Sequence, residues 1–178
     1  MKKYELIEEQ RQHNRTVYRI KALRDFSDVK AGEIGGYICG EKNLSHEGDA
    51  WVCGDAFILD NAVVKDNAVV CGNGLVYDDA VVSGNAKVYG KAIVYNNAKV
   101  EDDARAYGNA RVHGNAVVKG NARAYESVEL VDNVTVDDHA EVFGTAFICG
   151  DARILGDAKI CGTADISGSA EIKNGVIK

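Results

Sequence analysis

The chain has 178 residues, with 19 glycines, no proline, 46% hydrophobic residues and a net charge of −6. A charged fraction of 27% beside many Val, Ile and Ala is too apolar for a disordered chain, and the negative charge predicts no general affinity for nucleic acid or membranes. No apolar run approaches the roughly 20 residues that a membrane span needs, and the first residues lack the apolar core of a signal peptide. We therefore expect a cytoplasmic protein of one domain, with at most a small appendage.

The first 43 residues show no repeat and predict a small β cap. Residues 4–7 and 16–23 are typical of two strands, and His13 and Asn14 between them predict a hairpin turn. A stretch from Ala22 to Ile38 then leads into Trp51. We divide the chain into an N-terminal β cap, residues 1–43, and a repeat domain, residues 44–178.

A six-residue unit, Gly-Asn/Asp-Ala-x-Val/Ile-x, repeats from about Gly48 to the end of the chain. Every sixth position from Ala50 to Ala170 gives 21 slots, of which 18 hold Ala, and 18 of the 21 slots two residues later hold Val or Ile. The slot two residues before the Ala slot holds Gly 13 times, and the slot between them carries nine Asn and six Asp. The phase does not slip, so one structural unit is repeated throughout.

These two spacings predict a single-stranded parallel β-helix. Ala and Val/Ile are two residues apart, so both point to one side of a short strand, while Gly-Asn and Gly-Asp favour a turn because they tolerate a positive φ. Three units would make a triangular coil of about 18 residues, and residues 44–178 would build roughly seven coils. Proline would remove a hydrogen-bond donor from the ladder, which explains its absence. The cap would cover the open first coil, with Trp51 sealing the junction.

The repeat resembles the hexapeptide-repeat family of left-handed parallel β-helix proteins, best known for acyltransferases. The left hand is implied by this resemblance alone, and a right-handed helix of the bactofilin kind stays the alternative, since crossover connections are normally right-handed. The stretch from Ala22 to Ile38, continuing into Asn43–Val52, is similar to phage-associated and enterobacterial repeat proteins of the YdcK type, commonly labelled transferases. The resemblance implies a family, and trimers are common among its relatives.

Positions 18 residues apart should stack, which sorts the outward side chains onto three faces. Face one carries an aromatic column with Tyr89, Tyr107, Tyr125 and Phe143 between cysteines, beside a column with Lys87, Arg105, Arg123 and Glu141. Face two combines two columns into an apolar patch over three coils: Phe57, Leu59, Leu75, Tyr77, Ile93 and Tyr95. Face three is mostly polar. Stacked aromatics stabilise neighbouring strands within a chain, but a contiguous apolar patch usually marks an interface, so we expect a homo-oligomer, a dimer or trimer, built through faces one and two.

Catalytic residues are harder to nominate, because the repeat has no inserted loop. His113, in mid-face on a strand, is the one weak candidate for a general base, and no partner that would fix its tautomer is evident from the spacing. His139 occupies a turn slot whose column most simply satisfies turn amides, His46 belongs to the cap, and His13 to the hairpin.

No metal or cofactor is expected. A zinc site of the γ-carbonic-anhydrase type needs a close His pair that the chain lacks, and a calcium loop needs denser carboxylates. Cys53 and Cys71 should be coil neighbours within disulfide range, but we expect free thiols in a reducing compartment.

Two functions from different classes remain. The first is a non-enzymatic, self-associating β-helix scaffold or binding module that acts on a host protein or sequesters a small-molecule ligand, in a chain that a phage could encode. The alternative is an acyltransferase-like enzyme with sites in the grooves between subunits and His113 as its first candidate base. Whether the protein is an enzyme stays open at this point, with the uninterrupted repeat favouring a non-enzyme.

Overall fold

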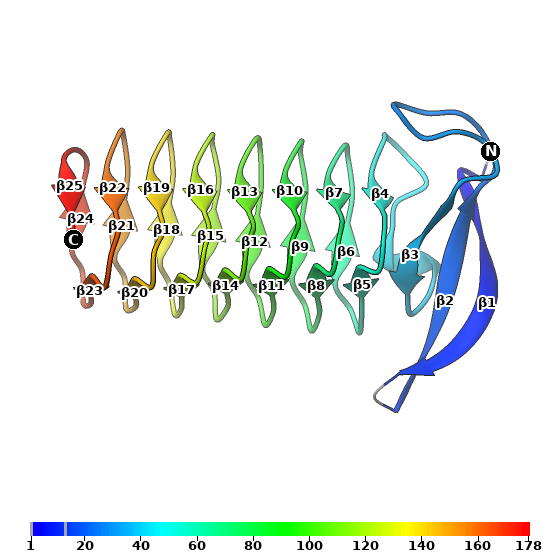
Figure 1. The fold of residues 1–178 in the computed structure, drawn as a ribbon, viewed down its shortest axis with the longest axis horizontal. Coiled ribbons are helices and arrows are strands. Elements are labelled where there is room, and N and C mark those ends of the chain that lie inside the picture. The colour runs from blue at the N-terminus through cyan, green and yellow to red at the C-terminus, as the bar shows by residue number, and fades with distance from the viewer. Residues whose placement is uncertain (1, 13) are drawn as a thin grey trace.

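The computed structural model describes residues 2–12 and 14–178 and contains strands, turns and one short 3-10 helix, η1 (Glu41–Asn43). Two-residue strands stack in columns along the long axis of the molecule, and three longer strands lie at its N-terminal end (Figure 1). The architecture is an all-β parallel solenoid, as the repeat predicts. The left-handed winding expected from the resemblance stays a prediction.

Three sheets form the sides of the solenoid, and we name them after the faces they carry. Sheet one has the order β25-β22-β19-β16-β13-β10-β7-β4, sheet three the order β24-β21-β18-β15-β12-β9-β6, and sheet two the order β1-β2-β3-β5-β8-β11-β14-β17-β20-β23. Neighbouring solenoid strands are parallel and pair residues 18 apart, as in Trp51↔Val69 and Lys87↔Arg105. The solenoid therefore has about eight turns, close to the seven expected.

The strand bounds follow the repeat. Sheet one consists of β4 (Trp51–Val52), β7 (Val69–Val70), β10 (Lys87–Val88), β13 (Arg105–Ala106), β16 (Arg123–Ala124), β19 (Glu141–Val142), β22 (Lys159–Ile160) and β25 (Val176–Ile177). Sheet three consists of β6 (Val63–Val64), β9 (Val81–Val82), β12 (Lys99–Val100), β15 (Val117–Val118), β18 (Thr135–Val136), β21 (Arg153–Ile154) and β24 (Glu171–Ile172). Sheet two adds β5 (Phe57–Ile58), β8 (Leu75–Val76), β11 (Ile93–Val94), β14 (Arg111–Val112), β17 (Glu129–Leu130), β20 (Phe147–Ile148) and β23 (Asp165–Ile166) to the three strands of the cap.

The interior is a column of alanine and branched aliphatic side chains. From Ala50 to Ile160 the inward residues are buried, nearly all at 0% exposure. Alanine at the corner and Val or Ile on the strand keep the coil narrow, and dispersion contacts between stacked side chains fill it without a second layer of structure.

Side chains in the turn slots make hydrogen bonds to the next coil, which the repeat pattern did not predict. Where the slot two residues before the Ala slot holds a carboxylate or amide rather than Gly, its backbone has a positive φ. Except at Asp60, whose carboxylate binds Arg15, the side chain in this slot accepts a hydrogen bond from the backbone amide one coil further on. Asp66 accepts from Gly84 N at 3.1 Å and Asp138 from Gly156 N at 2.9 Å. In the following slot Asn side chains donate to the Asn or Asp side chain one coil further on, as from Asn67 Nδ2 to Asn85 Oδ1 and from Asn85 Nδ2 to Asp103 Oδ1, both at 3.1 Å. Both devices join adjacent coils at the corners.

The cap is a three-stranded antiparallel sheet that continues into the solenoid. Strands β1 (Tyr4–Gln12) and β2 (Arg15–Ala22) form the expected hairpin, β2 pairs with β3 (Ile34–Ile38), and β3 pairs in parallel with β5. Leu44 bridges Val64 on sheet three. The first solenoid turn thus uses β3 and Leu44, which lie on either side of the boundary drawn at residue 43.

Trp51 seals the junction, as expected. It is 3% exposed and meets the rings of Phe26 and Tyr4 edge-on, at centroid distances of 5.3 and 6.5 Å. His46 stacks on Tyr4 at 4.3 Å and its Nδ1 accepts from Lys3 N, so it belongs to the cap as predicted. The open end of the first coil is therefore covered by aromatic rings.

Cys53 and Cys71 form a disulfide in the structure, with Cα atoms 4.6 Å apart, so the expectation of free thiols is wrong for this pair. The reason is geometric, because one coil spacing falls inside the Cα range that a disulfide spans. Cys39, Cys149 and Cys161 are free.

A buried lysine caps the backbone carbonyl groups at the N-terminal edge of sheet one. Lys3 is 0% exposed, and its ammonium donates to Ala50 O at 2.8 Å and Gly48 O at 3.2 Å, carbonyls that no preceding coil can satisfy. Burial lowers the pKa of Lys3 to about 8. Lys3 therefore loses its proton at a lower pH in the folded chain than in the unfolded chain. Between these two pKa values the unfolded state binds more protons than the folded state.

We expect the free energy of unfolding to rise with pH between about 7.5 and 9.5 through Lys3, by on the order of 1–2 kcal/mol. The variant Lys3→Met should lack this rise, because methionine does not titrate. Urea denaturation of both proteins across this range isolates the contribution of Lys3 as the difference between them. Parallel pH profiles would contradict the prediction.

Candidate functional site

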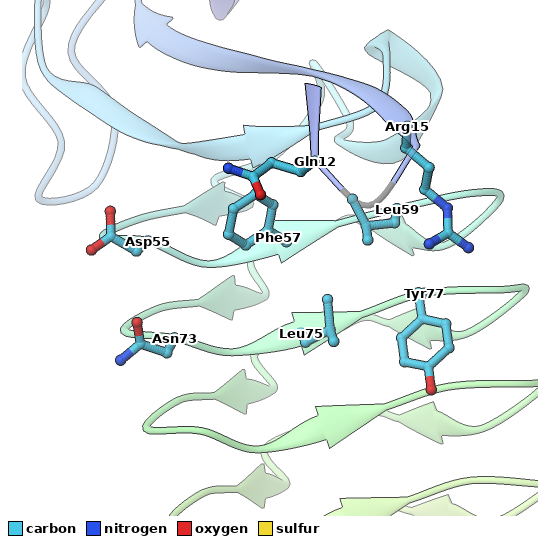
Figure 2. Close-up of a pocket in the computed structure, with 8 residues that line it drawn as sticks. All are labelled: Gln12, Arg15, Asp55, Phe57, Leu59, Asn73, Leu75 and Tyr77. Atoms are coloured by element: carbon cyan, nitrogen blue, oxygen red, sulfur yellow. The ribbon is translucent and has the colours of Figure 1, made fainter. Parts of the chain in front are cut away.

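A groove of about 510 Å³ lies where the hairpin overhangs sheet two. Its floor consists of apolar side chains from two successive coils, and two hairpin residues stand above it (Figure 2): Phe57, Leu59, Leu75 and Tyr77 below, Gln12 and Arg15 above. Asp55 and Asn73, in stacked turn slots, border one end of the groove. The arrangement combines an apolar floor with polar groups at its margin, as binding sites commonly do.

Contacts with the first coils hold the hairpin over the groove. Arg15 Nε and Nη2 donate to the two carboxylate oxygens of Asp60, both at 2.8 Å, which is a bidentate pair of defined geometry. Behind it, Val17, Tyr37 and Leu59 form a small buried cluster outside the solenoid interior. The Arg19 guanidinium lies 4.7 Å from the Tyr37 ring centroid, and the Tyr37 ring stacks on Phe57 at 4.7 Å. The overhang is thus a packed part of the fold.

Sheet two continues the apolar floor beyond the hairpin. The Tyr77, Tyr95 and His113 rings stack in one column, with centroids 4.9 and 4.5 Å apart, beside the column of Phe57, Leu75 and Ile93. The next residue of the second column is Arg111, which donates to the Tyr95 hydroxyl at 3.3 Å. Burial raises the pKa of Tyr77, so its hydroxyl stays neutral over the physiological range. Charged side chains therefore border the apolar strip at both ends, the Arg15–Asp60 pair at one end and Arg111 at the other.

The predicted interface residues fall into two groups on different sheets. Five of the six face-two residues remain half-buried and contiguous, whereas Leu59 is 7% exposed because the hairpin covers it. The face-one group stacks ring on ring from Tyr89 through Tyr107 and Tyr125 to Phe143, with centroids 4.8–4.9 Å apart. The structure thus makes one continuous surface from the first group and a separate ladder from the second.

His113 has a partner that the spacing did not reveal. Its Nε2 lies 2.9 Å from Glu129 Oε1, and its side chain is 15% exposed under the stack with Tyr95. Glu129 lies one coil further on in the neighbouring column. Aligning the two columns by coil would therefore have predicted that Glu129 lies close to His113. The pair lies on the strand surface, apart from the residues that line the groove. His139 is exposed in its turn, and His13 lies outside the described residues.

The hairpin residues of the groove, Gln12 and Arg15, are absent from the sequence-based prediction. Neither belongs to the repeat, so no periodicity relates them to the coils they approach. The one feature of the sequence that could have pointed to Arg15 is its partner Asp60. Acidic residues occupy many other turn slots as well, so Asp60 does not stand out.

Residues 104–120 match the YdcK β-solenoid repeat family. The matched segment spans β13, β14 and β15, one strand from each sheet, and so corresponds to about one solenoid turn. Together with the fold, it places a β-helix repeat in this chain. A comparison with curated proteins finds no match.

Over the described residues 2–12 and 14–178, no three His, Cys, Asp or Glu side chains gather in a cluster that could hold a metal ion. Within the same residues no helix has the length and apolar character to cross a membrane.

Proposed function

We propose that the protein is a rigid, self-associating binding module whose face-two surface receives a second copy of the chain. The observation that carries this proposal is the apolar strip from Phe57 to Tyr95, which continues from the groove onto open sheet. A strip of this kind in water costs free energy unless another surface covers it, and such patches usually mark interfaces.

The composition of the strip supports a protein partner. An apolar and aromatic centre lies between the Arg15–Asp60 pair and Arg111, and interfaces commonly have an apolar centre with a polar rim. The ladder of backbone hydrogen bonds holds each side chain at a constant spacing, so the surface changes little on binding and loses little conformational entropy. The mainly apolar lining of the groove favours binding over catalysis.

The double variant Leu75→Glu with Ile93→Glu tests the surface. We expect it to convert the assembly into a monomer, because the interface would then have to bury two charged carboxylates in place of two apolar side chains. Both side chains are half-exposed, so the new carboxylates would stay in water in the monomer. The two carboxylates would stand opposite each other, and Arg111, opposite position 93 on the next strand, would offset their repulsion, so the fold should tolerate them. Size-exclusion chromatography with light scattering measures the mass.

The matched control is Val81→Glu with Val117→Glu on sheet three. These valines have the same half-buried environment and flank Lys99 in register, but they lie on the polar face. The control should keep the wild-type mass. An unchanged mass in the face-two variant, or a monomeric wild-type protein, would refute self-association through this surface.

A further inference from the structure

One column of outward side chains runs the length of sheet two in the solenoid. Each member pairs in register with the next, one coil further on: Phe57, Leu75, Ile93, Arg111, Glu129, Phe147 and Asp165. Beyond the two charged residues the column becomes apolar again, at a Phe147 ring that is 39% exposed. From Ile93 to Phe147 the order is therefore apolar, positive, negative, apolar. Read in the opposite direction, the same order places each charge opposite its counter-charge.

The two charged residues of this column are only partly used within the chain. Arg111 donates to the Tyr95 hydroxyl at 3.3 Å, which leaves further N–H donors of the guanidinium. Glu129 Oε1 lies 2.9 Å from His113 Nε2, which leaves the second carboxylate oxygen. Although Arg111 and Glu129 stand opposite each other on β14 and β17, no ion pair joins them among the described residues. Both groups can therefore accept a partner from another chain.

The hairpin sets the relative direction of two copies that meet through sheet two. Gln12 and Arg15 stand above the groove floor, over the first two coils (Figure 2). If the two solenoids ran parallel about a two-fold axis, equal coils would face each other and both hairpins would need the same space. Antiparallel solenoids place the hairpins at opposite ends of the interface. The two-fold axis then lies within the interface, along the strand direction.

The order of the column selects one register of the antiparallel copies. With the axis between β14 and β17, Arg111 of each copy faces Glu129 of the other, and Ile93 faces Phe147. An axis on β14 would oppose two arginines, and an axis on β17 would oppose two glutamates. An axis on the outer side of either strand would set a charge against Ile93 or Phe147 and bury it without a partner. Among these registers, only the first joins opposite charges and also joins apolar side chains.

We propose that two copies bind face to face through sheet two with their solenoids antiparallel, and that Arg111 of each copy pairs with Glu129 of the other. This inference rests on the proposed self-association through face two, to which it adds the direction, the register and the residues that pair. Arg111 borders the apolar strip in a single chain, but it lies at the centre of the dimer. The two symmetric charge pairs fix the register, because any slip of one coil would break both of them.

Two apolar halves flank the charge pairs at the axis. In each half Ile93 of one copy packs against Phe147 of the other, and Tyr95 packs against Cys149, a half-buried free thiol. Each half extends to β8, which lies opposite β23 of the second copy and forms part of the groove floor. The groove under the hairpin is therefore the outer end of the interface, and it receives β23 of the second copy.

Exchange of the two charges between copies tests this register. Arg111→Glu brings two carboxylates together across the interface, and Glu129→Arg brings two cations together. Each variant alone should raise the dissociation constant of the dimer on the order of tenfold or more. A one-to-one mixture of the two variants should form a heterodimer that binds about as tightly as the wild type, because both pairs are restored with their charges exchanged. Native mass spectrometry identifies the heterodimer by mass, and light scattering over a dilution series gives the dissociation constant.

The double variant Arg111→Glu with Glu129→Arg in one chain should dimerise like the wild type, and it tests the pairing even if a single variant fails to fold. Lys99→Glu is the matched control, because it makes the same change of charge at an exposed cation on sheet three and should leave the dimer intact. The register is wrong if Arg111→Glu dimerises as tightly as Lys99→Glu, or if neither the mixture nor the double variant dimerises. Either result, with a dimeric wild type, leaves self-association through face two standing. A monomeric wild type refutes both proposals.

Discussion

Adding one methyl group at Gly36 is expected to detach the cap from the first solenoid turn. Gly36 lies in β3, where a Cβ atom would come within 2.6 Å of Ala56 O and 2.8 Å of Val52 Cγ1. The same Ala56 carbonyl accepts a hydrogen bond from Tyr37 N at 2.9 Å, so β3 cannot move away without losing the pairing with β5. We expect Gly36→Ala to cost about 2–3 kcal/mol and to lower the melting temperature by roughly 5–10 °C.

Detachment has a second consequence, because the cap covers the apolar interior and the first strand edges. An uncovered solenoid end invites aggregation, so the variant should also scatter light well before it unfolds. Calorimetry gives the melting temperature, and limited proteolysis should cut first within residues 1–43. Gly35→Ala should behave similarly, since its Cβ would lie 2.6 Å from Ile20 Cγ1 and Val52 O.

Gly40→Ala supplies the control within the same cap. Its backbone is extended, at a φ of 177°, and a Cβ there would have no atom within 4 Å. It should melt like the wild type. If Gly36→Ala melted with it, close approach of β3 to the first coil would not be what holds the cap in place.

The second large effect is expected at Asn43, which ends sheet three as Lys3 ends sheet one. Its side chain is 0% exposed, its amide donates to Ala62 O at 2.8 Å and Asp60 O at 3.1 Å, and its oxygen accepts from Gly40 N at 2.9 Å. Asn43→Leu keeps the approximate volume but leaves three backbone groups without partners. We expect a loss of about 2–4 kcal/mol, because each buried unsatisfied group costs free energy.

Asn43→Asp separates hydrogen bonding from packing. The carboxylate would still accept from Gly40 N but would face two carbonyl oxygens, so folding should raise its pKa. A group with a raised pKa in the folded state contributes stability that grows as the pH falls, since the folded chain then binds more protons. The stability of Asn43→Asp should therefore approach that of the wild type between about pH 7 and pH 4.

Denaturation curves at these two pH values measure the effect. Asn109→Asp is the control, because it adds the same charge at an exposed turn. A pH response of Asn43→Asp no larger than that of the control would show that the two carbonyl contacts carry little stability.

Much of the solenoid could be predicted from the residue pattern, because one six-residue period controls both the direction of each side chain and the position of each turn. The buried alanine column, the stacking of Tyr89 on Tyr107, and the apolar columns of face two follow from positions 18 residues apart. The hairpin and the sealing role of Trp51 were also predicted. The Cys53–Cys71 disulfide was not, since compartment and side-chain direction were weighed above the short coil spacing.

The candidate site was predicted only in part. The face-two residues form the floor of the groove, but the overhang of Gln12 and Arg15, and the covering of Leu59, depend on how β2 and β3 leave the first coil. The His113–Glu129 pair depends on side-chain conformations across two columns, which the repeat leaves free.

The sequence by itself determined the register of this protein, because a strand period of two and a turn every six residues permit one alignment of the coils. It thereby determined which residues share a face. Only the tertiary structure decided where the non-repeating cap lies on that regular surface, and with it the groove, the carbonyls closed by Lys3 and Asn43, and the approach of Gly36. The physical reason is that these contacts join the non-repeating cap to the repeating solenoid. Residue spacing says nothing about such contacts, so side-chain packing and hydrogen bonding determine where the cap lies.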